Sequence, residues 1–133
     1  MRLRTLAAAA CGTALALGIA ATPAHAGEAG PACGYEVCLG TTNGSATLYF
    51  DRYGGSTWQV CDDAPDGKRA IAEVRSPSGQ VLRLQAAGGY GTCSTQQTLY
   101  PAPAGGSAVS LKVWVQNGSN GSPQYTRYGT YRW

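Results

Sequence analysis

Residues 108–116 read AVSLKVWVQ, and this stretch decides the fold class. Apolar residues stand at every second position, with Ser, Lys, Trp and Gln between them. Such alternation is typical of a strand with one side on a core, because successive side chains point to opposite faces. No segment shows the period of an amphipathic helix. The sequence therefore predicts an all-β domain.

Similar alternating runs stand elsewhere in the chain, separated by Gly, Asn and Pro residues that favour turns. Six or seven antiparallel strands in one chain of this length predict a β-sandwich of two sheets. A small β-barrel is the alternative. The expected strands cover residues 46–53, 56–62, 69–75, 80–85, 95–100, 108–116 and 124–133.

The N-terminus has the pattern of a secretory signal peptide. Arg2 and Arg4 precede an apolar run over residues 6–19, and Ala24-His25-Ala26 forms an A-x-A cleavage signal. A membrane anchor is disfavoured because the run is shorter than the ~20 residues that span a bilayer. A lipoprotein would need Cys11, which lies inside the apolar run. We expect a signal peptide over 1–26, an N-terminal segment with a local disulfide over 27–44, and a β-sandwich over 45–133.

Cysteine usage agrees with export to an oxidising compartment. Cys11 would leave with the signal peptide, and four of the five cysteines would remain. An even number in a small secreted chain predicts two disulfides, for which three pairings are possible. We favour Cys33–Cys38, which is local, and Cys61–Cys93. Zinc binding is disfavoured because paired C-x-x-C motifs are absent from the sequence.

Charge excludes several classes of partner. The formal net charge of the full chain is +3, and Arg2 and Arg4 of the signal account for most of it. The remaining chain is too weakly basic for nucleic acid. It also lacks a polybasic segment for anionic lipid. We therefore expect a secreted, extracellular protein that contacts neither nucleic acid nor membrane after signal cleavage.

Residues 62–73, DDAPDGKRAIAE, match part of a calcium loop of the EF-hand type. Asp62 stands at position one, and Asp66, Gly67 and Glu73 follow at positions five, six and twelve. Position three is Ala64, and both flanks alternate like strands, whereas an EF-hand loop needs helices. A turn between two strands explains the stretch better. A calcium site of another type, using Asp62, Asp63 and Asp66, is the weaker alternative.

Catalytic residues are scarce. The only histidine, His25, would leave with the signal peptide, which removes His-based triads and general bases. Oxidised cysteines supply no thiolate. Carboxylates remain, but the sequence does not place two of them across a cleft as a glycosidase requires. We therefore expect no enzyme activity and no cofactor.

Aromatic residues are the candidate binding residues. Several stand on the strand positions opposite the expected core, where exposed rings could stack on sugar or anchor a protein. The alternative is that these positions are covered, or that Tyr simply suits strands. A Gly-rich loop at 88–93 presents a further tyrosine next to Cys93. The candidate ligand-binding residues are Trp114, Tyr49, Tyr53, Tyr125, Tyr131, Trp133 and Tyr90.

Three short motifs carry a resemblance. They are WQVCD at residues 58–62, DG at 66–67 and GGYGTC at 88–93. With them the chain resembles small secreted proteins of high-GC Gram-positive bacteria that share a signal peptide, a V-C-D…D-G turn and a later Gly-rich cysteine segment. The resemblance covers residues 45–116. It implies the fold and the compartment, and it carries over no functional residue.

The sequence thus predicts a secreted, monomeric binding protein without catalysis. Its expected ligand is a cell-wall or other polysaccharide, bound through surface aromatics and loops. Two other functions stay open. One is a disulfide-stabilised inhibitor of a secreted hydrolase, which would bind a protein partner. The other is a structural protein of a cell or spore surface, which would self-associate.

Overall fold

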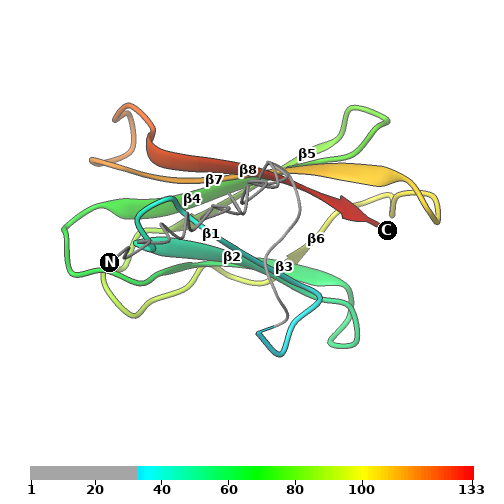
Figure 1. The fold of residues 1–133 in the computed structure, drawn as a ribbon, viewed down its shortest axis with the longest axis horizontal. Coiled ribbons are helices and arrows are strands. Elements are labelled where there is room, and N and C mark those ends of the chain that lie inside the picture. The colour runs from blue at the N-terminus through cyan, green and yellow to red at the C-terminus, as the bar shows by residue number, and fades with distance from the viewer. Residues whose placement is uncertain (1–32) are drawn as a thin grey trace, which may run out of the picture.

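The computed structural model describes residues 33–133, which form two antiparallel sheets of four strands each (Figure 1). The signal peptide expected at 1–26 and the first residues of the expected N-terminal segment, 27–32, lie outside the described residues. The strand order is β1-β2-β3-β6 in the first sheet and β5-β4-β7-β8 in the second. The strands are β1 (Val37–Gly40), β2 (Ala46–Asp51), β3 (Thr57–Asp62), β4 (Arg69–Arg75), β5 (Val81–Ala86), β6 (Gln97–Thr98), β7 (Ala108–Gln116) and β8 (Gln124–Arg132).

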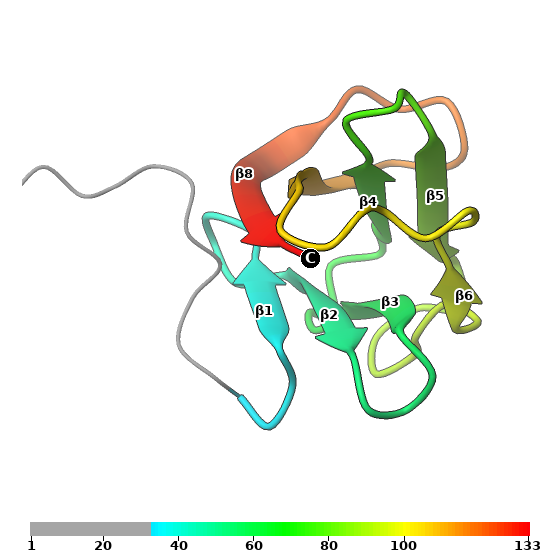
Figure 2. The ribbon, with the colours of Figure 1, turned by 90° about the vertical axis from the view of Figure 1, so that its right-hand side faces the viewer.

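The expected β-sandwich is confirmed. Figure 2 shows β1, β2 and β3 in one layer and β4, β5 and β8 in the layer facing it. The alternative of a small β-barrel is wrong, because the strands form two separate sheets rather than one closed sheet. Strands β4 and β7 have the bounds that alternation predicted. The expected strand at 95–100 is shorter, since only Gln97 and Thr98 pair with β3.

The core lies between the two sheets, as the alternation of the strands requires. Strand β7 buries every second residue from Val109 to Val115 against the facing sheet. Phe50 of β2 stacks on Trp58 of β3, with ring centroids 4.3 Å apart. Both rings are fully buried. This aromatic pair fills one end of the space between the sheets.

Strand β1 extends the sandwich beyond the expected start at residue 45. Val37 and Leu39 are each 1% exposed, and β1 pairs with β2 through Val37↔Phe50 and Leu39↔Leu48. The sequence instead predicts a separate N-terminal segment over 27–44 that contains these residues. Two apolar residues beside a cysteine and a glycine are too short a pattern to predict a strand. Residues 37–40 form a strand because they pair with the edge of β2.

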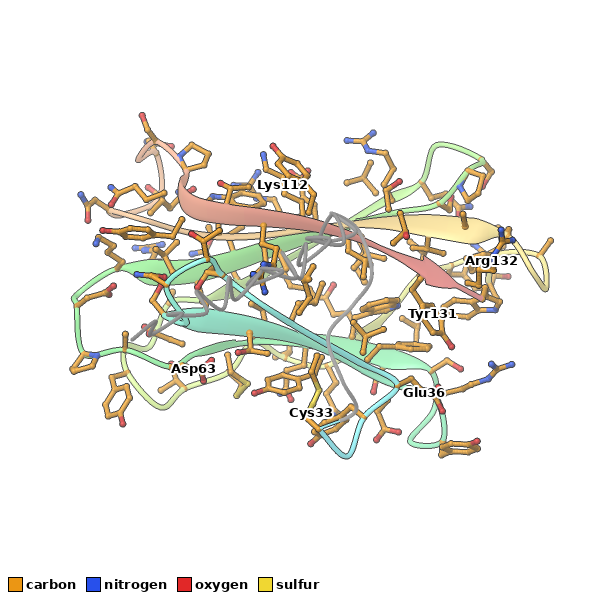
Figure 3. All side chains as sticks on the ribbon, in the orientation of Figure 1. Cys33, Glu36, Asp63, Lys112, Tyr131 and Arg132 are labelled. Carbon is orange, nitrogen blue, oxygen red and sulfur yellow. A yellow bond between two sulfur atoms is a disulfide. The ribbon has the colours of Figure 1, made fainter. Side chains whose placement is uncertain are left out.

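Two expected surface aromatics face the core instead. Tyr131 of β8 and Trp133, which follows β8, pack on Phe50, each with a centroid distance of 5.2 Å. Figure 3 shows Tyr131 between the two sheets. The cause is register: Tyr131 pairs with Val109, and partners across antiparallel strands share a face. The expectation that Tyr131 and Trp133 form part of an exposed row is therefore wrong.

Both predicted disulfides are present, Cys33–Cys38 and Cys61–Cys93. The second joins the end of β3 to the Gly-rich loop, and an isolated bridge also pairs Cys61 with Cys93. Two disulfides in a small domain are the mark of an oxidising environment. Within residues 33–133, no helix is long and apolar enough to cross a membrane.

Candidate functional site

The remaining expected binding aromatics do not gather on one face. Tyr53 is 91% exposed in the turn between β2 and β3. Tyr125 lies at the start of β8, where the Lys68 ammonium stands 5.2 Å from its ring centroid. Tyr90 stands on the Gly-rich loop, and Tyr49 lies on the outer side of the first sheet. The structure therefore does not assemble these four tyrosines into one binding surface.

Trp114 points away from the core, as its position in β7 predicted, but it is only 2% exposed. Two cations cover its ring, with the Arg83 guanidinium 5.2 Å and the Lys112 ammonium 4.5 Å from the centroid. Its indole Nε1–H donates to Oε1 of Gln116 at 2.9 Å. Long cationic side chains lie across apolar surface and keep their charge in water. The Trp114 ring, which we expected to be exposed, is therefore covered by the side chains of Arg83 and Lys112.

The outer side of the first sheet carries a groove of about 370 Å³. We call it the tyrosine groove. Strand pairing builds its floor, since Tyr49 of β2 lies between Cys38 of β1 and Gln59 of β3 on one row across the sheet. These three side chains point outward because Leu48 and Phe50 beside Tyr49 point into the core. The groove is lined by Cys33, Tyr35, Tyr49, Gln59, Cys61, Asp62, Asp63, Gly91 and Cys93.

The two disulfides stand on opposite sides of this groove. Cys33–Cys38 anchors the chain before β1, and Cys61–Cys93 anchors the Gly-rich loop to β3. Figure 3 shows Cys33 and Asp63 on the outer side of the first sheet, away from the second. Cross-links on both sides hold the groove's shape before any ligand arrives, which lowers the cost of ordering on binding.

A pair of tyrosines provides the aromatic surface of the groove. The rings of Tyr35 and Tyr49 have centroids 5.1 Å apart and are tilted by 55°. Tyr35 is 42% exposed, and Tyr49 is half-buried. Sequence reasoning missed Tyr35. The signal that could have found it is its place inside the short Cys33–Cys38 loop, which must hold it close to the neighbouring strand.

Polar groups also line the groove. The Gln59 side-chain amide donates to the backbone carbonyl of Ser94 at 2.8 Å, which fixes its orientation. The Thr47 hydroxyl donates to Oδ2 of Asp63 at 2.6 Å. Asp63 is exposed, so its carboxylate retains acceptor capacity for a ligand. The groove therefore joins aromatic faces to an oriented amide and a carboxylate.

The Gly-rich loop forms one rim of the groove through Gly91. The loop is a tight turn, in which the Thr92 backbone N–H and hydroxyl both donate to the carbonyl of Gly89. Gly91 has a φ of 77°, a conformation that glycine adopts without strain. Tyr90 at the tip is 65% exposed. A firmly held turn thus exposes Tyr90 to solvent, while its neighbour Gly91 lines the groove.

Asp62 is buried where the groove meets the end of the sandwich. It is 2% exposed, and its Oδ1 accepts from the backbone N–H of Ala64 at 3.2 Å. Its Oδ2 has no hydrogen-bond partner among residues 33–133. Burial is the main cause that raises the pKa of Asp62. The Ala64 bond opposes the rise, and the charges of Asp66 and Asp63 add to it.

The three carboxylates of the calcium hypothesis have different partners. Asp62 is buried against Ala64, Asp63 accepts from Thr47, and Asp66 lies 3.7 Å from the Lys68 ammonium. Within residues 33–133, no three His, Cys, Asp or Glu side chains are grouped as a metal ion would require. The segment instead forms the turn between β3 and β4, where the Lys68 backbone N–H donates to Asp66.

Comparisons of the chain with protein-family models, with curated proteins and with solved structures found no match.

Proposed function

We propose that this protein is a secreted, non-catalytic binding protein whose tyrosine groove holds a sugar unit of an extracellular polysaccharide. The observation that carries the proposal is the Tyr35–Tyr49 ring pair, which lies in one groove with Gln59 and Asp63. The apolar C–H faces of a sugar pack on aromatic rings, while its hydroxyls need donors and acceptors. The groove offers both kinds of surface at once.

The volume and rigidity of the groove support this proposal. About 370 Å³ lies at the lower end of the range typical of small-ligand sites, and it suits a single sugar unit of a longer chain. The floor is a β-sheet and both sides are cross-linked, so little conformational freedom is lost when a ligand binds. The two disulfides agree with an extracellular location, where such polymers occur.

The test is a pull-down of the oxidised protein, starting at residue 27, on a panel of insoluble polysaccharides and purified cell walls. Retention on at least one polymer is expected. Tyr49→Ala and Tyr35→Ala should then reduce retention at least tenfold. Tyr53→Ala is the matched control, because Tyr53 is 91% exposed in a turn and does not line the groove.

Two results would contradict the proposal. One is a lack of retention on every polymer. The other is a loss of retention that is equal for Tyr53→Ala and Tyr49→Ala, which would place the binding outside the groove. Circular dichroism of each variant separates lost binding from lost folding, since neither Tyr35 nor Tyr53 is buried.

A second candidate function rests on Tyr90. Its ring is 65% exposed at the tip of a turn that the Cys61–Cys93 disulfide holds, and such a fixed loop suits insertion into the cleft of a secreted hydrolase. An inhibitor should slow a secreted protease in a panel, and Tyr90→Ala should abolish the effect. Tyr100→Ala is the control, because Tyr100 is 86% exposed elsewhere. If no protease is slowed, this candidate is excluded for the enzymes tested.

A further inference from the structure

A second cavity, of about 280 Å³, lies on the outer side of the other sheet. Three adjacent strands build it, because Glu73 of β4 pairs with Lys112 of β7, which in turn pairs with Tyr128 of β8. Figure 3 shows Lys112 on the outer side of the second sheet, opposite the face that carries Cys33 and Asp63. The cavity is lined by Glu73, Arg75, Ser110, Leu111, Lys112 and Tyr128.

The strands of this sheet are strongly basic. Their charged residues are six cations and a single carboxylate, Glu73, and all four strands lie within the described residues. Arg83 forms an ion pair with Glu73 at 3.3 Å, so that carboxylate is already engaged. The cations are Arg69, Arg75, Arg83, Lys112, Arg127 and Arg132.

The other ion pair among residues 33–133 joins Lys68 to Asp66, away from this cavity. Arg75 and Lys112 therefore have no salt-bridge partner within that part of the chain, and both line the same cavity. The one carboxylate in the cavity lining, Glu73, is already paired with Arg83, so Arg75 and Lys112 leave a positive potential there that favours an anion.

Lys112 is held in place without being neutralised. Its ammonium lies 4.5 Å from the centroid of Trp114 and 5.8 Å from that of Tyr128. Aromatic faces attract a cation but leave its charge available to a ligand. Trp114 is itself fixed by its hydrogen bond to Gln116. The side chain of Lys112 is thus oriented before an anion arrives.

We propose that this cavity is a binding site for the carboxylate or phosphate groups of an acidic polysaccharide. Arg75 and Lys112 pair with the anionic group, since charged hydrogen bonds of this kind are the strong ones. The Ser110 hydroxyl is exposed and can donate to the same group. Tyr128 is 65% exposed, and its ring can carry the sugar that bears the anion. The site lies on the face opposite the tyrosine groove and does not depend on it.

The test uses four polymers with the oxidised protein starting at residue 27. Carboxymethyl-dextran and phosphorylated dextran carry the two anions on one backbone, unmodified dextran lacks them, and inorganic polyphosphate lacks the sugar. Titration calorimetry at low salt should show binding of at least one acidic dextran and weaker or no binding of plain dextran. The acidic dextran that binds more tightly identifies the anion.

Variants then locate the site. Lys112→Gln should weaken binding of the acidic dextran at least tenfold, and Arg75→Gln at least threefold. Arg52→Gln is the matched control, because it removes the same charge from an exposed residue of the β2–β3 turn. It should change binding less than twofold. Tyr53→Ala removes an exposed ring that lines neither cavity, and it should also leave this binding unchanged.

Three outcomes would overturn the proposal. The first is that neither acidic dextran binds at low salt. The second is an equal loss for Arg52→Gln and Lys112→Gln, which would mean that overall charge alone attracts the polymer. The third is tight binding of polyphosphate that Tyr128→Ala leaves unchanged, with no preference for acidic dextran, which would exclude a role for the sugar. Thermal unfolding of each variant verifies that the fold is kept.

Discussion

The rings of Tyr35 and Tyr49 lie 5.1 Å apart on the outside of the first sheet, although only Tyr49 belongs to a strand of that sheet. Tyr35 stands in the loop that the Cys33–Cys38 disulfide closes just before β1. The pairing of the two rings therefore depends on a covalent link as well as on the sheet. This arrangement connects the redox state of one disulfide to the shape of the groove.

The first prediction concerns that disulfide. The double variant Cys33→Ala/Cys38→Ala should weaken retention on the polysaccharide that the wild type binds, because Tyr35 loses its tether. The loss of stability should be at most about 2 kcal/mol, since the closed loop is short. Pull-down and urea unfolding measure the two effects. Unchanged retention in a folded variant would show that Tyr35 takes no part in binding.

The Cys61–Cys93 disulfide should contribute more to the stability of the fold than the Cys33–Cys38 disulfide does. Cys61–Cys93 closes a loop with a sequence separation of 32 residues. The loop-entropy relation gives about 3.7 kcal/mol for such a loop, so Cys61→Ala/Cys93→Ala should lower the free energy of unfolding by roughly that amount. Urea unfolding of both double variants gives the comparison. A smaller loss than for Cys33→Ala/Cys38→Ala would contradict the prediction.

Asp62 should make stability depend on pH in the opposite sense to a salt-bridged carboxylate. Its pKa in the folded state is raised above its ordinary value of 3.8, mainly by burial. The folded state therefore holds the proton more tightly, and the stability that this proton contributes is present below pH ~3.8 and lost as pH rises through the folded pKa. At neutral pH the charged, buried group destabilises the fold.

Asp62→Asn should remove this dependence, because an amide keeps the acceptor for the Ala64 N–H and carries no charge. The variant should be more stable than the wild type at pH 7, and the difference should disappear towards pH 3. Thermal unfolding across that range is the measurement. Asp63→Asn is the control, because Asp63 is exposed. Parallel stability curves for wild type and Asp62→Asn would refute the assignment.

Tyr131 should behave as a core residue rather than a binding residue. Its ring packs on Phe50 and contacts Trp58 edge-on, with a centroid distance of 6.3 Å. Tyr131→Ala should cost on the order of 2 kcal/mol, which is less than the ~3–5 kcal/mol of a fully buried aromatic ring because Tyr131 is half-buried. Tyr131→Phe should cost much less. Chemical unfolding measures both losses of stability. A Tyr131→Ala protein that keeps its stability and loses only binding would contradict the assignment of Tyr131 to the core.

The sequence by itself determined the all-β class and the bounds of two strands, and it predicted the pairing of the cysteines. Alternation placed β4 and β7 at their observed bounds, because each strand buries every second side chain against the facing sheet. The even number of cysteines predicted two disulfides, and their spacing favoured a local pair and a pair in the core half of the chain. These features depend on residues that are close in the sequence or that repeat with the two-residue period of a strand.

Only the tertiary structure decided which faces are covered. Trp114 has the position of an exposed residue, yet Arg83 from another strand lies across its ring. Tyr131 turned inward because its register with β7 put it opposite Val109. Tyr35 entered the groove because β1 joined the edge of β2. Each of these outcomes depends on contacts between segments that are distant in the sequence. The pattern of apolar and polar residues in one strand does not predict which other segments will cover its two faces.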